Sequence, residues 1–117
     1  MSRLVYIGLS FALLLALVPG PAQSASGYTR KVILDNARTT VTMSTWLPGA
    51  TSPSATRGPR VIFYLTATKL KRNYADGHTS LISQAAGSTA YRPKDPQPNS
   101  ITNVGTNTVR LYTVTLK

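Results

Sequence analysis

The sequence contains no cysteine, no glutamate and only one histidine. Without cysteine the chain has no disulfides, thiolate nucleophiles or zinc-thiolate sites, so a hydrophobic core must hold the fold together. Acidic residues are scarce, because only Asp35, Asp76 and Asp95 stand against 13 lysines and arginines. These three acids sit in three separate turns, so no pair of them is expected to share a catalytic cleft.

The charge balance is strongly basic, with a formal net charge of +10. A basic surface attracts polyanions such as nucleic acid or anionic lipid. The basic residues are spread along the chain, and the densest cluster, "KLKR" at 69–72, has only Tyr74 close behind it as an aromatic. We therefore favour a solvated basic surface over a nucleic-acid interface.

The first 24 residues have the pattern of a cleavable signal peptide. A short basic start, Met1–Arg3, precedes the apolar run Leu4–Val18, and "PGPAQSAS" follows. The small residues predict cleavage after Ser24 or Ala25. The alternative is a retained anchor, but the run is shorter than the ~20 residues that span a bilayer. We expect one domain, residues 25–117, that is secreted or periplasmic and not stably inserted in a membrane.

The remainder of the chain predicts an all-β sandwich or barrel. Apolar and polar residues alternate with the period of a strand, turn residues recur between the runs, and no helical periodicity is present. "ADGH" predicts a hairpin at Asp76-Gly77, and the three prolines of Pro93–Pro98 exclude a central strand there. The expected strands are Tyr28–Leu34, Arg38–Leu47, Arg60–Thr66, Lys69–Tyr74, His78–Gln84, Ser88–Arg92, Asn99–Val104 and Thr108–Leu116.

Large apolar side chains of these strands are predicted to form the core. They are Trp46, Phe63, Tyr64, Leu65, Leu81, Ile82, Val109, Leu111, Tyr112, Val114 and Leu116.

Several segments together resemble the small single-domain cupins of the RmlC-like jelly-roll family. They are "VILDNARTTVTMSTWLPGATSP", "RVIFYLTATKLKRNYADG", "QAAGSTAYRP" and "NSITNVGTNTVRLYTVTLK", in the order and near the spacing of that family. The resemblance covers residues 28–117. It implies a double-stranded β-helix, also called a jelly-roll barrel.

The resemblance also identifies the positions where such cupins hold a metal. In this sequence those positions carry Ala55, Arg57, Val61 or Ile62, and Pro98 or Asn99. Apolar side chains have no lone pairs, and arginine repels a cation. We therefore expect no metal and no other cofactor. The single histidine, His78, is interpreted as a solvated turn residue.

These observations favour a non-catalytic binding module for a small anionic or carbohydrate ligand or a partner protein. The candidate ligand-binding residues are Arg57, Arg60, Tyr64, Tyr91 and Asn99. Arg57 has a second interpretation, a solvated residue on a flexible loop rich in Pro, Gly, Ser and Thr.

Two other functions stay open. One is a metal-free or partner-completed enzyme of the isomerase, epimerase or oxygenase-like kind, and the other is a structural β-sandwich. A homodimer that pairs through edge strands is also expected, because exposed strand edges invite pairing.

Overall fold

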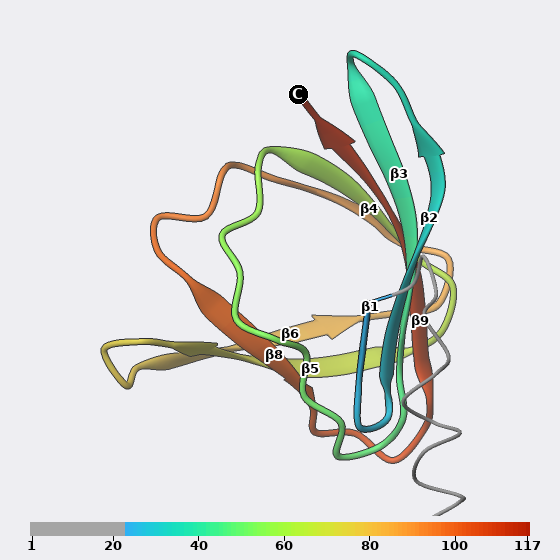
Figure 1. The fold of residues 1–117 in the computed structure, drawn as a ribbon. Helices are drawn as coiled ribbons and strands as arrows, with labels where there is room; N and C mark the ends of the chain where they lie inside the picture. Colours follow the sequence, from blue (N-terminus) through green and yellow to red (C-terminus); the bar gives the residue numbers. More distant parts are fainter. Residues whose placement is uncertain (1–22) are drawn as a thin grey trace, which may run out of the picture.

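The computed structural model describes residues 23–117, all of them in strands, turns and loops (Figure 1). The predicted signal peptide lies outside the described residues except for Gln23 and Ser24. The strands are β1 (Gln23–Ala25), β2 (Tyr28–Asp35), β3 (Thr39–Trp46), β4 (Arg60–Tyr64), β5 (Thr68–Tyr74), β6 (Thr79–Gln84), β7 (Thr89–Arg92), β8 (Asn99–Asn103) and β9 (Val109–Leu116). Every strand predicted from the sequence is present. Within this part of the chain no helix is long and apolar enough to cross a membrane.

Two antiparallel sheets form the domain. The larger has the order β1-β2-β3-β9-β4-β7 and the smaller has the order β6-β5-β8. The last strand, β9, lies between β3 and β4, so the chain ends in the middle of the larger sheet (Figure 1). The two sheets enclose a central space between their inner faces. Each strand therefore has one face toward this space and one toward the outside.

The segment between β3 and β4 does not form a free loop. Its backbone runs along β8, with hydrogen bonds from Gly49 N to Asn103 O (2.9 Å), Ser52 N to Ile101 O (2.8 Å) and Ala55 N to Asn99 O (3.0 Å). The prediction of a flexible loop is therefore wrong, because β8 supplies hydrogen-bond partners to the backbone of this segment, much as a neighbouring strand would. The pairing brings Arg57 to one end of β8.

Aromatic and aliphatic side chains from both sheets make up the core. The rings of Tyr28 and Trp46 lie 4.9 Å apart, and Trp46 Nε1 donates a hydrogen bond to Ile101 O at 3.1 Å, which joins β3 to β8. The buried apolar residues are Tyr28, Trp46, Ala50, Ile62, Tyr64, Leu70, Ile101, Val109 and Leu111.

The predicted core is correct only in part. Trp46, Tyr64, Val109 and Leu111 are buried. The other large apolar side chains of the prediction include four that are exposed, Phe63, Leu65, Leu81 and Leu116. Side-chain alternation explains Phe63, Leu81 and Leu116, which lie on the outer faces of strands that also carry inward residues, whereas Leu65 follows the end of β4.

Candidate functional site

A cavity of about 420 Å³ lies between the two sheets. This volume is within the range of small-molecule sites. The larger sheet contributes alternate residues of four strands, among them Arg30 of β2, Thr42 of β3, Thr113 of β9 and Arg60 of β4. The smaller sheet adds Leu70, Arg72, Ile82 and Ile101, and the segment along β8 adds Arg57. We call this cavity the barrel pocket.

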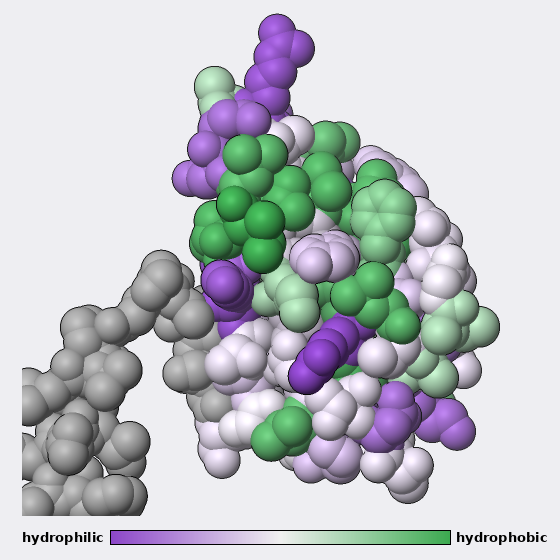
Figure 2. All heavy atoms as spheres, turned by 90° about the vertical axis from the view of Figure 1, so that its right-hand side faces the viewer, coloured by the Kyte–Doolittle hydropathy of each residue, from purple (hydrophilic) through white to green (hydrophobic). Residues whose placement is uncertain are grey.

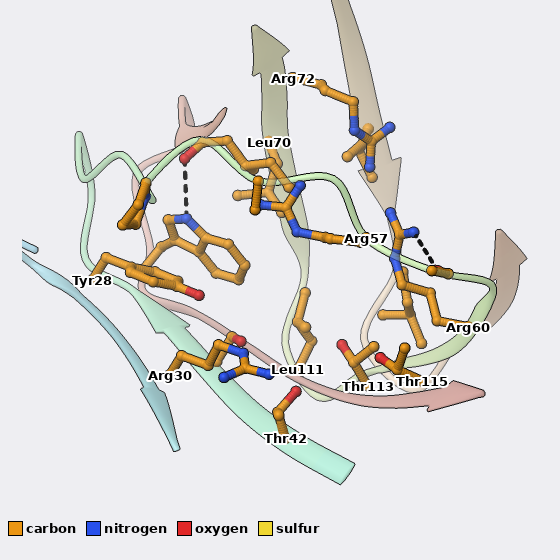
Figure 3. A pocket seen from close by; sticks show the side chains of 18 of the residues that line it. Tyr28, Arg30, Thr42, Arg57, Arg60, Leu70, Arg72, Leu111, Thr113 and Thr115 are labelled. Atoms are coloured by element: carbon orange, nitrogen blue, oxygen red, sulfur yellow. Dashed lines mark hydrogen bonds between the residues drawn. The ribbon is translucent and has the colours of Figure 1, made fainter. Parts of the chain in front are cut away.

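Figure 3 shows arginine side chains reaching the barrel pocket from different elements. Arg57, Arg60 and Arg72 gather on one side, while Arg30 lies across the pocket near Tyr28. Arg60 and Arg72 are each only 2% exposed, which is rare for a charged residue unless it is paired. The positive charges therefore belong to the interior of this barrel and not only to its surface.

Asp95 is the carboxylate that balances part of this charge. Its side chain accepts hydrogen bonds from Arg60 Nη2 (3.1 Å), from the backbone N–H of Arg57 (2.9 Å) and from Asn99 Nδ2 (3.2 Å). Burial alone would raise the pKa of Asp95, but the Arg57 N–H, the charge of Arg60 and the Asn99 amide outweigh it and hold the pKa below its ordinary value. Asp95 is thus an ionised structural anion.

Asn99 connects Arg57 and Arg72. Its amide oxygen accepts from Arg57 Nη1 at 2.9 Å and from Arg72 Nε at 3.2 Å. Both ends of this side chain are occupied, since its nitrogen donates to Asp95 and to Gln97 O. Asn99 therefore orients two guanidinium groups without neutralising either of them.

Arg72 is left with unused hydrogen-bonding capacity. Apart from the Nε bond to Asn99, its guanidinium donates no hydrogen bond to any described residue. Arg92 Nε is the only fully enclosed side-chain nitrogen or oxygen without a partner in residues 26–117, so the terminal nitrogens of Arg72, a residue that lines the barrel pocket, keep accessible surface. Burial, followed by the nearby charge of Arg92, lowers the pKa of Arg72. Arginine nevertheless stays protonated in proteins.

The wall of the pocket formed by β3 and β9, opposite Arg72, carries hydroxyl groups. Thr42, Ser44, Thr113 and Thr115 all line the pocket. Thr42 and Ser44 are buried, at 4% and 5% exposure, and in the described part of the chain their hydroxyls make no side-chain hydrogen bond and are not fully enclosed. A ligand with hydroxyl groups would supply the partners that these side chains lack.

The residues of the pocket do not fit a metal ion. Its charged groups are guanidiniums, which cannot ligate a cation, and Asp95, which does not line the pocket, is already held by Arg57 and Arg60. Among the described residues no three His, Cys, Asp or Glu side chains come together. His78 stacks on Tyr74 at the hairpin, with ring centroids 4.1 Å apart, and its side chain is 56% exposed.

The structure brings together four of the five candidate residues. Arg57, Arg60 and Tyr64 line the pocket, and Asn99 lies buried directly behind the first of them. Arg57 is therefore not a solvated loop residue, since its side chain is 23% exposed. Tyr91 lies elsewhere, 60% exposed and paired with Val61 on the outer side of the larger sheet.

Sequence reasoning missed Arg72, Asp95 and Arg30. In the sequence Arg72 is one of the three cations of "KLKR", but it lies two residues from the buried Leu70 and so shares its face of the strand. Asp95 lies among prolines, and its neighbours in the sequence do not indicate that it forms a buried ion pair. Its role depends on Arg57 and Arg60, which are distant in sequence.

Comparison with known proteins identifies the fold. The chain resembles a cupin domain from Bordetella pertussis Tohama I, with a TM-score of 0.70 and 19% identity over 81% of this chain and 98% of that one. A protein with a double-stranded β-helix domain from Klebsiella pneumoniae gives a TM-score of 0.62 and 19% identity over 80% of both chains. A polyketide cyclase from Streptomyces resistomycificus gives 0.56 and 17% identity, over 86% of this chain and 70% of that one.

These structures confirm the predicted fold class, an all-β double-stranded β-helix of the cupin type. No family model matches the sequence, and no curated protein matches it. The fold is therefore established by structure, and the function has to be argued from the site itself.

Proposed function

We propose that this cupin-fold protein binds a small organic anion in the barrel pocket, with Arg72 and Arg57 as its main donors. The supporting observation is Arg72, a buried guanidinium that lines the pocket, with terminal nitrogens that keep accessible surface and donate to no described residue. A buried charge without a partner is costly. A carboxylate between Arg72 and Arg57 would accept these free donors in the bidentate geometry that guanidinium groups favour.

The charge count favours a ligand with two negative charges. Arg57 and Arg60 contact one carboxylate, Asp95, and Arg72 is linked to them through Asn99, so these three arginines and one carboxylate carry two net positive charges. Arg30 adds another on the opposite wall (Figure 3). Because the cations are spread around the cavity and not gathered at one point, two separated carboxylates suit it better than a single phosphate.

The hydroxyl-bearing wall indicates that the ligand itself carries hydroxyl groups. Thr42, Ser44, Thr113 and Thr115 face the pocket as donors and acceptors. A hydroxylated dicarboxylate, of the class of sugar diacids, would engage the arginines with its ends and these side chains with its middle. This is the ligand class that we propose.

Binding is a better description of this site than catalysis. Asp95 is held ionised by its hydrogen bonds, and burial raises the pKa of the Tyr64 hydroxyl, which keeps it protonated. His78 lies at the outer hairpin, bonded to Asp76. The described residues that line the pocket include no histidine, carboxylate or lysine, which are common general bases.

A ligand panel measured by titration calorimetry tests this proposal. Suitable probes are glucarate, tartrate, gluconate, inorganic phosphate and the neutral polyol glucitol. Trp46, the only tryptophan, lines the pocket, so its fluorescence gives an independent readout. We expect both hydroxylated diacids to bind more tightly than gluconate or phosphate and glucitol not to bind. Equal binding of glucitol, or no response to any acid at millimolar concentration, would contradict the proposal.

A further inference from the structure

Arg92 is a further cation on the inner face of the larger sheet. It lies directly opposite Arg60 in the register of β4 and β7, and residues paired in this way have their side chains on the same face, about 5 Å apart. The neighbouring pair, Val61 and Tyr91, points to the outer side of this sheet, where Figure 2 shows hydrophobic side chains gathered over the upper part. Alternation along both strands therefore turns Arg60 and Arg92 inward together.

Arg60 and Arg92 differ in how their charge is compensated. Arg60 Nη2 donates to the carboxylate of Asp95 at 3.1 Å. Arg92 Nε is fully enclosed without a hydrogen-bond partner, and in residues 26–117 Arg92 takes part in no ion pair. Like charges directly opposite each other in a sheet are destabilising, and an enclosed N–H group without an acceptor is costly. An anion beside Arg92 would remove the first of these costs.

Two other donors without acceptors lie near Arg92. The terminal nitrogens of Arg72 donate to no described residue, and the hydroxyl of Tyr64, a residue only 3% exposed, has no hydrogen-bond partner among the described residues. Burial raises the pKa of this hydroxyl, and the nearby charges of Arg72 and Arg92 act against the rise. Because the effect of a charge falls with distance, donors from β4, β5 and β7 face one region of the interior.

Ser80 of β6 indicates how an ion reaches this region. It lies directly opposite Arg72 in the register of β5 and β6, so it shares the inner face of the smaller sheet, and it is exposed. β6 and β7 are edge strands of the two sheets, and no ladder of hydrogen bonds joins them in residues 23–117. Solvent therefore has access to the inner face of the smaller sheet at its β6 edge.

We infer that a small inorganic oxyanion, of the phosphate or sulfate kind, binds between Arg72 and Arg92. We call this place the seam site. Only Nε of Arg92 is enclosed without a partner, so its terminal nitrogens keep accessible surface. Guanidinium groups hold oxyanions with paired, charge-assisted hydrogen bonds. A tetrahedral anion has acceptors on all sides and so suits donors from three strands, the third being the Tyr64 hydroxyl.

The seam site is distinct from the barrel pocket, although the two share Arg72. Arg92 does not line the barrel pocket. Arg72 has both terminal nitrogens free of described partners, so it has donors for an anion on each side. The inorganic anion and the diacid are therefore expected to bind together.

Titration calorimetry with inorganic phosphate tests the seam site, at an ionic strength held constant with sodium chloride so that screening does not change. We expect one phosphate per chain, with and without glucarate. Arg92→Met should weaken phosphate binding at least about tenfold, the loss expected for hydrogen bonds to a charged group, and should affect glucarate much less. Lys94→Met is the matched control, because it removes an exposed positive charge two residues away and should bind phosphate like the wild type.

Thermal melting gives a second readout and verifies that each variant folds. Without phosphate, Arg92→Met should melt at a higher temperature than the wild type, because it removes an unpartnered N–H group and the like charge opposite Arg60. Phosphate should raise the melting temperature of the wild type and of Lys94→Met, but not that of Arg92→Met.

Three results would overturn the inference. The first is no saturable phosphate binding at millimolar concentration, and the second is equal phosphate affinity in Arg92→Met and the wild type. The third is a total of one anion per chain when phosphate and glucarate are both present, which would place phosphate in the barrel pocket. A protein that binds phosphate through Arg92 but does not bind glucarate would support the seam site and contradict the function proposed for the barrel pocket.

Discussion

The amide oxygen of Asn99 on β8 accepts a hydrogen bond from Arg72 Nε on β5, at 3.2 Å. The same oxygen accepts from Arg57 Nη1. One neutral side chain therefore sets the direction of two cations, the buried Arg72 and the half-buried Arg57, without neutralising either of them. This arrangement separates the positioning of the guanidinium groups from their neutralisation.

Replacement of Asn99 by alanine is expected to loosen both guanidinium groups. Arg57 and Arg72 lose their shared acceptor and Asp95 loses a donor, so the free energy of unfolding should fall by about 2–3 kcal/mol. The affinity for the diacid should weaken about tenfold or more, because the donors are no longer held in place. Chemical denaturation and calorimetry measure the two effects.

Asn73→Ala is the matched control for this change. Asn73 also bridges β5 to β8, but its amide bonds Ser100 and Thr102 on the outer side. It should cost some stability and leave the diacid affinity unchanged. A similar loss of affinity in both variants would mean that general loosening of the smaller sheet, and not arginine orientation, explains the effect.

Acid should destabilise the fold through Asp95. The folded-state pKa of Asp95 lies below its ordinary value of 3.8, so its stabilising contribution is fully present above about pH 4 and is lost as the pH falls through the lower folded-state value. Asp95→Asn removes the partner of a buried pair and should cost roughly 3–5 kcal/mol at neutral pH.

The variant should also respond less steeply to acid than the wild type below about pH 4. The exposed Asp76 also has a lowered pKa, first from the His78 backbone N–H, so Asp76→Asn serves as the control and should change neutral stability little. Thermal melting from pH 2 to pH 7 tests this account. An Asp95→Asn protein as stable as the wild type at pH 7 would show that the buried pair contributes nothing.

Divalent metals are expected to leave the protein unchanged. Arginines occupy the side of the pocket where the resemblance to cupins implies a metal, and a cation there would meet their repulsion. Thermal melting with Mn, Fe, Ni, Cu and Zn should show no stabilisation, and elemental mass spectrometry of the untagged protein should find substoichiometric metal. One tightly held equivalent per chain would contradict this expectation and return an enzymatic function to consideration.

The sequence predicted the strands and the fold well because both depend on local pattern. The apolar run at Arg60–Tyr64, the alternation in Val109–Leu116 and the Asp76-Gly77 turn are visible without tertiary information. Gly77 indeed adopts φ of +94°, which the hairpin needs. The motif resemblance then supplied the arrangement of the strands.

The site was only partly predictable from the sequence, because it depends on contacts between residues that are far apart along the chain. Which face of β3 turns inward was undecided from the sequence, since Thr42 and Ser44 are polar and Val41 and Met43 are apolar, and the structure buries the polar pair. The interior charge likewise depends on Asp95, which meets Arg60 across 35 residues. Charged residues are mostly exposed in folded proteins, so a prediction based on this tendency is wrong where charged side chains line an interior pocket.

Anion binding by Arg72 is tested most directly when Arg72→Met is compared with Lys71→Met by titration calorimetry against glucarate. Both changes remove one positive charge from adjacent residues of β5, but only Arg72 lines the barrel pocket. We predict that Arg72→Met weakens binding about 10–100-fold, the loss expected for hydrogen bonds to a charged group, whereas Lys71→Met binds like the wild type. Equal affinity in both variants, with both proteins folded, would contradict the assignment of Arg72 as the anion-binding residue.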